Sequence, residues 1–223
     1  MRNTSKSDFS SQLEGLENKL IDSLRDNPLI AIVRPKKDEL NKMSYQEEIL
    51  EYIEAINRLG IKNIEIEWSS VDEWQQLIIS IKNNFPDISL GAASINHIEE
   101  LDSIRKLNLT YAISPIWSYK LQAQAKELNQ ILIPGLFSPT EIYKSIDFGC
   151  RIIKLFPASI LGKYYLKHLK DPIKNLPFVI AAGGLGVKDI RPWLEEGYGA
   201  IAIGKNLSKD SELKLLRKEI SGQ

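Results

Sequence analysis

Cysteine and histidine are scarce in this sequence. Cys150 is the only cysteine, so no disulfide can form within the chain. His97 and His168 are the only histidines, so we expect no histidine-rich metal site and a function that needs no metal or other cofactor. No apolar run approaches the roughly 18 residues of a membrane span, and segment 1–15 lacks the apolar centre of a signal peptide. These absences predict a cytoplasmic protein that does not bind membranes.

An excess of either charge is also missing. The chain has 29 basic and 29 acidic residues, so its formal net charge is zero and we expect no bulk attraction to nucleic acid. Hydrophobic residues make up 43% of the 223 positions, which is enough for a sizeable core. This length suits one large domain, and a β/α barrel commonly occupies that size as a single unit.

Short apolar runs recur along the chain and alternate with stretches of helical periodicity, for example 46–59 and 71–84. The runs predict eight strands, at 29–34, 61–67, 88–92, 110–114, 131–135, 152–156, 178–182 and 200–204. Strands that alternate with helices predict βαβ units and a parallel sheet. Eight such units favour a closed α/β fold, the (β/α)8 TIM barrel, over an open doubly wound sheet.

A further helix is predicted before the first strand. Phe9, Leu13, Leu16, Leu20 and Leu24 recur at spacings of three and four, which makes a narrow apolar stripe on one helix face. We expect an N-terminal helical extension over 1–27 that packs against the barrel, at its N-terminal end, with the catalytic barrel over 28–223. The alternative is a partly frayed surface helix.

The most informative segment for chemistry is the predicted strand 152–156. Side chains alternate along a strand, so Lys154 shares one face with Ile152 and Phe156. Burial among apolar groups disfavours the charged ammonium, lowers the pKa of the lysine and leaves a free amine that can attack a carbonyl. The alternative is a structural lysine that is held in an ion pair.

A partner for this lysine stands on the predicted strand 61–67. Glu65 and Glu67 alternate there with isoleucines; if the isoleucines face the helices, both carboxylates point into the barrel, with Glu67 nearer the C-terminal mouth where barrel active sites lie. A carboxylate beside a neutral amine can move the protons of carbinolamine formation and C–C cleavage. The alternative is that the two glutamates only pair with Lys154 or Arg34.

Glycines follow the seventh and eighth predicted strands. Gly183 and Gly184 follow one, and Gly204 precedes Lys205 at the end of the other. Backbone N–H groups at such turns can approach a phosphate or another anion, and Lys205 would add a positive charge. The alternative is plain turn geometry, since glycine is the usual residue wherever φ is positive.

Other strand ends carry candidate substrate contacts. Arg34 can bind both oxygens of a carboxylate, or it can be an ordinary surface arginine. Ser94 can bond a substrate or cap the helix that follows. Pro115 and Phe156, also at strand ends, are the remaining residues that we expect to contact substrate.

Over about 28–207 the sequence resembles the family of 2-keto-3-deoxy-6-phosphogluconate (KDPG) and 4-hydroxy-2-oxoglutarate (KHG) aldolases. The segment 154–158, KLFPA, matches the Schiff-base motif of that family, and 60–66, GIKNIEI, is similar to the strand that carries its catalytic glutamate. The other similar segments, in family order, are 30–34, 91–94 (GAAS), 112–115 (AISP), 133–135 with 138–141, 183–184 and 204.

The resemblance implies a lyase of carbohydrate metabolism that cleaves a 2-oxo-acid aldol, such as KDPG or KHG, to pyruvate and an aldehyde. It implies that Lys154 forms the imine with the 2-oxo acid and that Glu65 moves the protons. It further implies a homotrimer that needs no metal, whose partner is a small 2-oxo acid with or without a phosphate.

The sequence also departs from the family pattern. Ser69 stands where the family usually has an arginine, and Ala182 stands where it has a threonine. Lys205 replaces a serine and Ser159 an acidic residue. The imine-forming pair is retained while substrate-holding groups differ. Two alternatives therefore stay open: a barrel that binds a phosphorylated or carboxylated ligand with little or no turnover, and a sugar-phosphate isomerase or decarboxylase.

Overall fold

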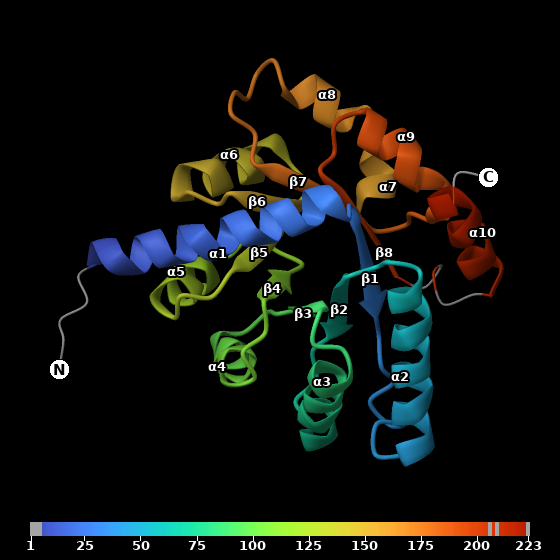
Figure 1. Cartoon of the computed structure of the whole chain (residues 1–223). Coiled ribbons are helices and arrows are strands. Elements are labelled where there is room, and N and C mark those ends of the chain that lie inside the picture. Colours follow the sequence, from blue (N-terminus) through green and yellow to red (C-terminus); the bar gives the residue numbers. More distant parts are fainter. Residues whose placement is uncertain (1–5, 205–206, 208–209, 222–223) are drawn as a thin grey trace.

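Eight parallel strands close into a barrel in the computed structural model of the chain (Figure 1). The structure describes residues 6–204, 207 and 210–221. Each strand pairs with its neighbours in sequence, and the eighth pairs with the first. The strands are β1 Leu29–Val33, β2 Asn63–Glu67, β3 Ser89–Ala93, β4 Tyr111–Ser114, β5 Leu132–Leu136, β6 Ile152–Leu155, β7 Phe178–Ala182 and β8 Ala200–Ile203.

Helices connect successive strands and form the outer layer. Their apolar faces pack on the outward side chains of the strands, in one continuous core that includes Ile53, Trp74 and Leu101. The helical elements are α1 Lys6–Asp26, α2 Met43–Arg58, α3 Asp72–Asn84, α4 Ile98–Lys106, α5 Tyr119–Glu127, α6 Pro139–Phe148, α7 Ala158–Leu161, α8 Tyr165–Leu169, η1 Val187–Asp189, α9 Ile190–Glu195 and α10 Asp210–Ser221.

Helix α6 shows how local sequence sets these boundaries. Ser138 precedes the helix and its hydroxyl accepts from the backbone N–H of Glu141, while the Glu141 carboxylate accepts from the backbone N–H groups of Phe137 and Ser138. This reciprocal cap satisfies donors that a helix start leaves unpaired. The helix ends at Gly149, whose φ of 96° is a left-handed conformation that glycine adopts without strain.

The predicted fold class is confirmed, and all eight predicted strands are present. Their bounds differ from the predicted ones by no more than two residues, at the start of β2. The agreement has a simple cause. Strands that are buried on both faces read as short continuous apolar runs, and the polar turn residues between runs separate them clearly.

Helix α1 covers the end of the barrel at which the strands begin. Leu20, Ile21 and Leu24 are buried in the same cluster as the inward side chains of the strands, including Ile30. Polar contacts hold the helix there: the Ser23 hydroxyl donates to the Asn63 side chain at the start of β2, at 3.1 Å. Leu20 and Leu24 of the predicted stripe are thus buried. Of the rest, Leu13 is partly buried, Leu16 is exposed, and the side chain of Phe9 lies outside the described part.

No helix in the described ranges is both long enough and apolar enough to cross a membrane.

The seal made by α1 should contribute measurably to stability. Leu24→Ala removes a side chain that is 0% exposed, and we expect it to lower the free energy of unfolding by about 2–5 kcal/mol, because it leaves a cavity against the barrel floor. Leu16→Ala, on the same helix but 38% exposed, is the matched control and should cost much less. Urea titration followed by circular dichroism measures both. Equal losses for the two variants would contradict the proposed packing.

Candidate active site

Lys154 lies on β6 with its side chain inside the barrel and only 6% of its surface exposed. Its nearest register partners are Gly135 on β5 and Ile180 on β7, neither of which offers a charge. Burial lowers the pKa of its ammonium, and Arg34 lowers it further, while Glu65 acts in the opposite direction. The balance favours a neutral amine, which is the nucleophilic form of lysine.

Glu65 lies on β2 and is completely buried. Neither of its carboxylate oxygens has a hydrogen-bond partner in the part of the chain that the structure describes. Burial raises its pKa, and the positive charges of Lys154 and Arg34 offset part of that rise. A carboxyl group in this setting favours its protonated form and can therefore donate a proton as well as accept one.

The amine and the carboxyl group face the same interior from opposite sides. Strands β2 and β6 stand opposite each other in the closed barrel, and each of the two residues affects the pKa of the other. No hydrogen bond joins the Glu65 oxygens to Lys154. The arrangement is therefore not a hydrogen-bonded structural ion pair. The sequence prediction that they share one interior agrees with this structure.

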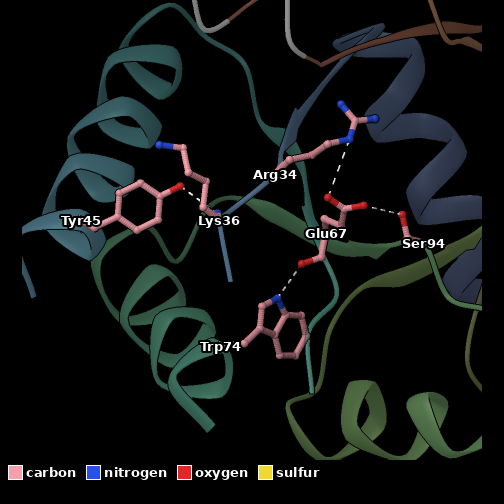
Figure 2. A network of polar contacts seen from close by, with 6 residues as sticks. All are labelled: Arg34, Lys36, Tyr45, Glu67, Trp74 and Ser94. Atoms are coloured by element: carbon pink, nitrogen blue, oxygen red, sulfur yellow. Dashed lines mark hydrogen bonds and ion pairs between the residues drawn. The ribbon is translucent and has the colours of Figure 1, made fainter. Parts of the chain in front are cut away.

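Glu67 connects three strand ends at the C-terminal mouth (Figure 2). One carboxylate oxygen accepts from the Ser94 hydroxyl at 3.1 Å, and the other lies 3.9 Å from the Nε of Arg34. The backbone carbonyl of Glu67 accepts from the indole N–H of Trp74 at 2.9 Å, which fixes the end of β2 against α3. The carboxylate of Glu67 thus orients Arg34 and Ser94 toward one another at the mouth.

Ser94 has a role that the sequence did not suggest. It takes a φ of 66°, which turns the chain after β3 and places its hydroxyl on Glu67. It does not cap α4, because that helix begins at Ile98 with His97 at the N-cap position. Of the two roles predicted for Ser94, helix capping is therefore wrong, and contact with a substrate remains a prediction.

Arg34 extends from the end of β1 toward the end of β8. A Cβ atom added at Gly204 would lie against its Nη1, so the guanidinium closely approaches this glycine. The Nε of the same group faces Glu67 (Figure 2). Arg34 thus lies at the C-terminal mouth of the barrel in contact with Glu67 and is not a free surface arginine, although 40% of its side chain is exposed.

Gly183 and Gly184 form the turn after β7, with φ values of 93° and 78°. An added Cβ at Gly183 would lie 2.9 Å from the Phe156 ring, and one at Gly184 would strike the Ser159 hydroxyl. The Gly183 carbonyl also accepts from the backbone N–H of Ser159 at 3.1 Å. Turn geometry and packing thus account for both glycines, while anion binding remains a prediction. Lys205, the other half of that prediction, lies outside the described residues.

Phe156 and Pro115 flank the lysine. The Phe156 ring centroid lies 5.7 Å from the Nζ of Lys154. Pro115 follows β4, and its carbonyl oxygen packs against Gly135, the register partner of Lys154 on β5. Both residues are half-buried, and both lie on the side of the barrel that carries the amine.

Two positions matter here beyond the predicted set. Ser69, which replaces an arginine of the family pattern, is 4% exposed, and its hydroxyl has no partner in the described part of the chain. Tyr111 on β4 is wholly buried inside the barrel. Sequence reasoning missed Tyr111 because it begins an apolar run and reads as core; its place on the same strand face as Ile113 was the available signal. Across the described residues, no group of three His, Cys, Asp or Glu side chains is placed to hold a metal ion.

Comparison with known proteins agrees with this geometry. A relative from Escherichia coli K12, 2-dehydro-3-deoxy-6-phosphogalactonate aldolase, is 26% identical over 181 residues, which are 81% of this chain and 84% of the relative.

Solved structures show the same barrel. A KDPG aldolase from Legionella pneumophila, with pyruvate captured as a covalent carbinolamine, superposes with a TM-score of 0.71 at 21% identity and covers 86% of this chain and 91% of its own. A KDPG aldolase from Zymomonas mobilis with 3-phosphoglycerate gives a TM-score of 0.72 at 19% identity, covering 90% and 94%. The model of the KDPG and KHG aldolase family matches residues 21–219. The chain therefore belongs to the KDPG and KHG aldolase family.

Proposed function

We propose that this protein is a class I aldolase in which Lys154 forms an imine with a 2-oxo-acid aldol and Glu65 transfers the protons. The observation that carries the proposal is a buried amine that faces a buried carboxyl group across the barrel, with the pKa of the first lowered and that of the second raised. In this state the pair can hold its proton on the carboxyl group, which leaves the amine free to attack. A pure binding site has no need of that arrangement.

The steps follow from these two groups. The Lys154 amine adds to the keto carbon, and Glu65 protonates the resulting hydroxyl, which leaves as water and gives an iminium ion. The Glu65 carboxylate then takes the proton of the substrate hydroxyl at C4. The C3–C4 bond breaks, an aldehyde leaves, and the electron pair moves into the iminium to form an enamine. Protonation of the enamine and hydrolysis of the imine release pyruvate and regenerate the amine.

Arg34, Ser94, Pro115 and Phe156 are proposed to hold the substrate at the mouth. The guanidinium of Arg34 suits the 2-oxo-acid carboxylate, since it can donate to both oxygens. Glu67 supports this role indirectly, because its contact with Arg34 limits the positions that the long side chain can take. Phe156 borders the Lys154 amine and would exclude water from the imine.

A phosphate or similar anion is proposed to lie near the turns at Gly183, Gly184 and Gly204, together with Lys205. The closeness of the Arg34 guanidinium to Gly204 supports this, because it puts a fixed positive charge at the end of β8. The Zymomonas mobilis aldolase was solved with 3-phosphoglycerate, and the Escherichia coli relative acts on a phosphorylated sugar acid by its name. KDPG, its galactonate isomer and the unphosphorylated KHG are therefore the substrates to compare.

We also propose that the protein assembles as a homotrimer. Large apolar side chains are exposed on the loops and helix starts that follow β4, β5 and β6, which is the pattern of a surface that another subunit covers. These residues are Ile116, Tyr119, Phe137, Tyr143, Ile160 and Tyr164.

Lys154 should carry the covalent intermediate. Borohydride reduction in the presence of pyruvate should add the reduced adduct to the peptide that contains Lys154, at lower pH than an ordinary lysine would need, because the pKa of Lys154 is lowered. Lys154→Met should abolish the adduct and turnover, whereas Lys62→Met, which changes a partly buried lysine that donates to the Asn57 side chain just before β2, should keep both. Peptide mass spectrometry reads the result. An adduct elsewhere, or none with any 2-oxo acid, would leave only the ligand-binding barrel.

Glu65 and Glu67 should separate in kinetic tests. Glu65→Gln should lower kcat by about a hundredfold or more, since general acid–base help is typically worth that much. Glu67→Gln keeps the same shape at the mouth and should mainly raise KM, because Arg34 loses its charged partner while proton transfer is intact. Imine trapping on Lys154 should be slow but detectable in Glu65→Gln. If instead Glu67→Gln loses kcat and Glu65→Gln does not, Glu67 is the acid–base residue.

The glycine turns should create a preference for phosphorylated substrates. The phosphorylated member of a matched substrate pair should show a lower KM, and Lys205→Ala should reduce that preference by about tenfold, as expected for loss of a charge-assisted contact. Lys19→Ala, on α1 at the opposite end of the barrel, is the control and should leave the preference unchanged. Equal KM values for both substrates in the parent protein would rule out a phosphate site.

A further inference from the structure

Tyr111 is a polar residue in the apolar barrel interior whose hydroxyl group has no evident structural use. The side chain is 0% exposed and lies in the inner cluster with Ile113 and Ile133. Its hydroxyl makes no hydrogen bond to any group in the described part of the chain. A buried hydroxyl without a partner costs stability, and a phenylalanine of nearly the same shape would avoid that cost.

The strand register directs this hydroxyl toward Glu65. Glu65 pairs with Gly91 on β3, and Gly91 pairs with Tyr111 on β4, so the two side chains start two strands apart on one level. Gly91 has no side chain between them, and a Cβ there would lie 2.4 Å from the Cε2 of the tyrosine ring. The ring therefore lies across Gly91, on the β2 side of its own strand. Because Gly91 has no side chain, the Tyr111 ring can pack over it and approach the carboxyl group of Glu65.

The groups around Glu65 differ in what they can offer it. Lys154 faces it from β6 but must lose its proton to act as a nucleophile, and it then brings no positive charge. Arg34 acts from β1, but its Nε is directed at Glu67. Gly91 on β3 has no side chain to offer. Burial and the nearby Glu65 charge raise the pKa of Tyr111 well above its ordinary value, so its hydroxyl keeps its proton at any working pH.

We propose that Tyr111 is a positioning residue for Glu65, and that its hydroxyl donates a hydrogen bond to the carboxylate whenever Glu65 is charged. The proposal rests on the function proposed above, in which Glu65 alternates between its charged and protonated forms. A neutral donor that never loses its proton can steady the carboxylate in every cycle without adding a charge beside the amine. Neither oxygen of Glu65 has another partner in the described chain, so the site is open to this donor.

The hydrogen bond has a defined consequence for pH dependence. A donor to the charged form lowers the pKa of a carboxyl group, which opposes the rise caused by burial. Without the tyrosine hydroxyl, Glu65 would stay protonated to higher pH and would be unable to act as a base there. Glu65 acts as a base only in the iminium complex, whose ionisations kcat reports, so the acid limb of kcat should move to higher pH while the rate on the plateau changes less.

Tyr111→Phe tests this, because it removes only the hydroxyl and should fold at least as stably as the parent. We expect the acid limb of kcat to rise by about one pH unit, as for loss of one hydrogen bond to a charged group. Tyr198→Phe is the matched control: that tyrosine is also buried, at 3% exposed, but packs against Trp193 outside the barrel interior, and its loss should leave the limb in place. An unmoved limb in Tyr111→Phe, or a shift to lower pH, overturns the proposal.

An infrared titration separates this proposal from the reaction itself. The carboxyl C=O band of Glu65, assigned by subtraction of the Glu65→Gln spectrum, reports its protonation in the resting protein without turnover. Its midpoint should rise in Tyr111→Phe, in the same direction as the kinetic limb. A shifted midpoint in a protein that forms no adduct on Lys154 would support the contact and refute the aldolase. An unshifted midpoint in an active aldolase would refute the contact alone.

Discussion

An amine and a carboxyl group share the apolar interior of this barrel, and each is less stable there in its charged form. Water is largely excluded, so burial lowers the pKa of Lys154 and raises that of Glu65. Proton transfer from the lysine to the glutamate removes both charges at once. The state that burial favours is therefore the state in which the amine can attack a carbonyl, so packing and catalysis impose the same requirement on this pair.

The rest of the fold keeps that interior apolar and closed. Helix α1 covers the floor with Leu20, Ile21 and Leu24, and isoleucines from β1, β4, β5, β6 and β7 fill the space above it. At the C-terminal mouth lie the charged side chains of Arg34 and Glu67, and their opposite charges largely offset each other. Only the Nε of Arg34 faces Glu67, so a substrate carboxylate could bind the other donors of the guanidinium while that contact remains. The mouth can thus accept an anion without placing an unpaired charge beside the amine.

The face of a strand on which a side chain lies could be predicted from the two-residue alternation of the sequence. Contacts between side chains of different strands could not. Alternation along β2 and β6 was enough to place Glu65 and Lys154 inside the barrel, because a strand turns every second residue inward. The partner of Ser94 on Glu67 and the approach of Arg34 to Gly204 depend on register and on side-chain reach between strands. No local pattern encodes that register, and the glycine signal alone fitted an anion turn equally well.

The glycines show why sequence alone left the substrate open. Gly183 leaves room for the Phe156 ring and Gly91 for the Tyr111 ring, so packing requires both whether or not a ligand binds, and Gly204 lies against the Arg34 guanidinium. A phosphate at the turns would therefore use space and charge that packing has already arranged. We therefore expect substrate preference to depend on the side chains that these glycines admit more than on the glycines themselves. Variation at the mouth can then change the aldehyde half of the substrate while the amine and the carboxyl group below keep one chemistry.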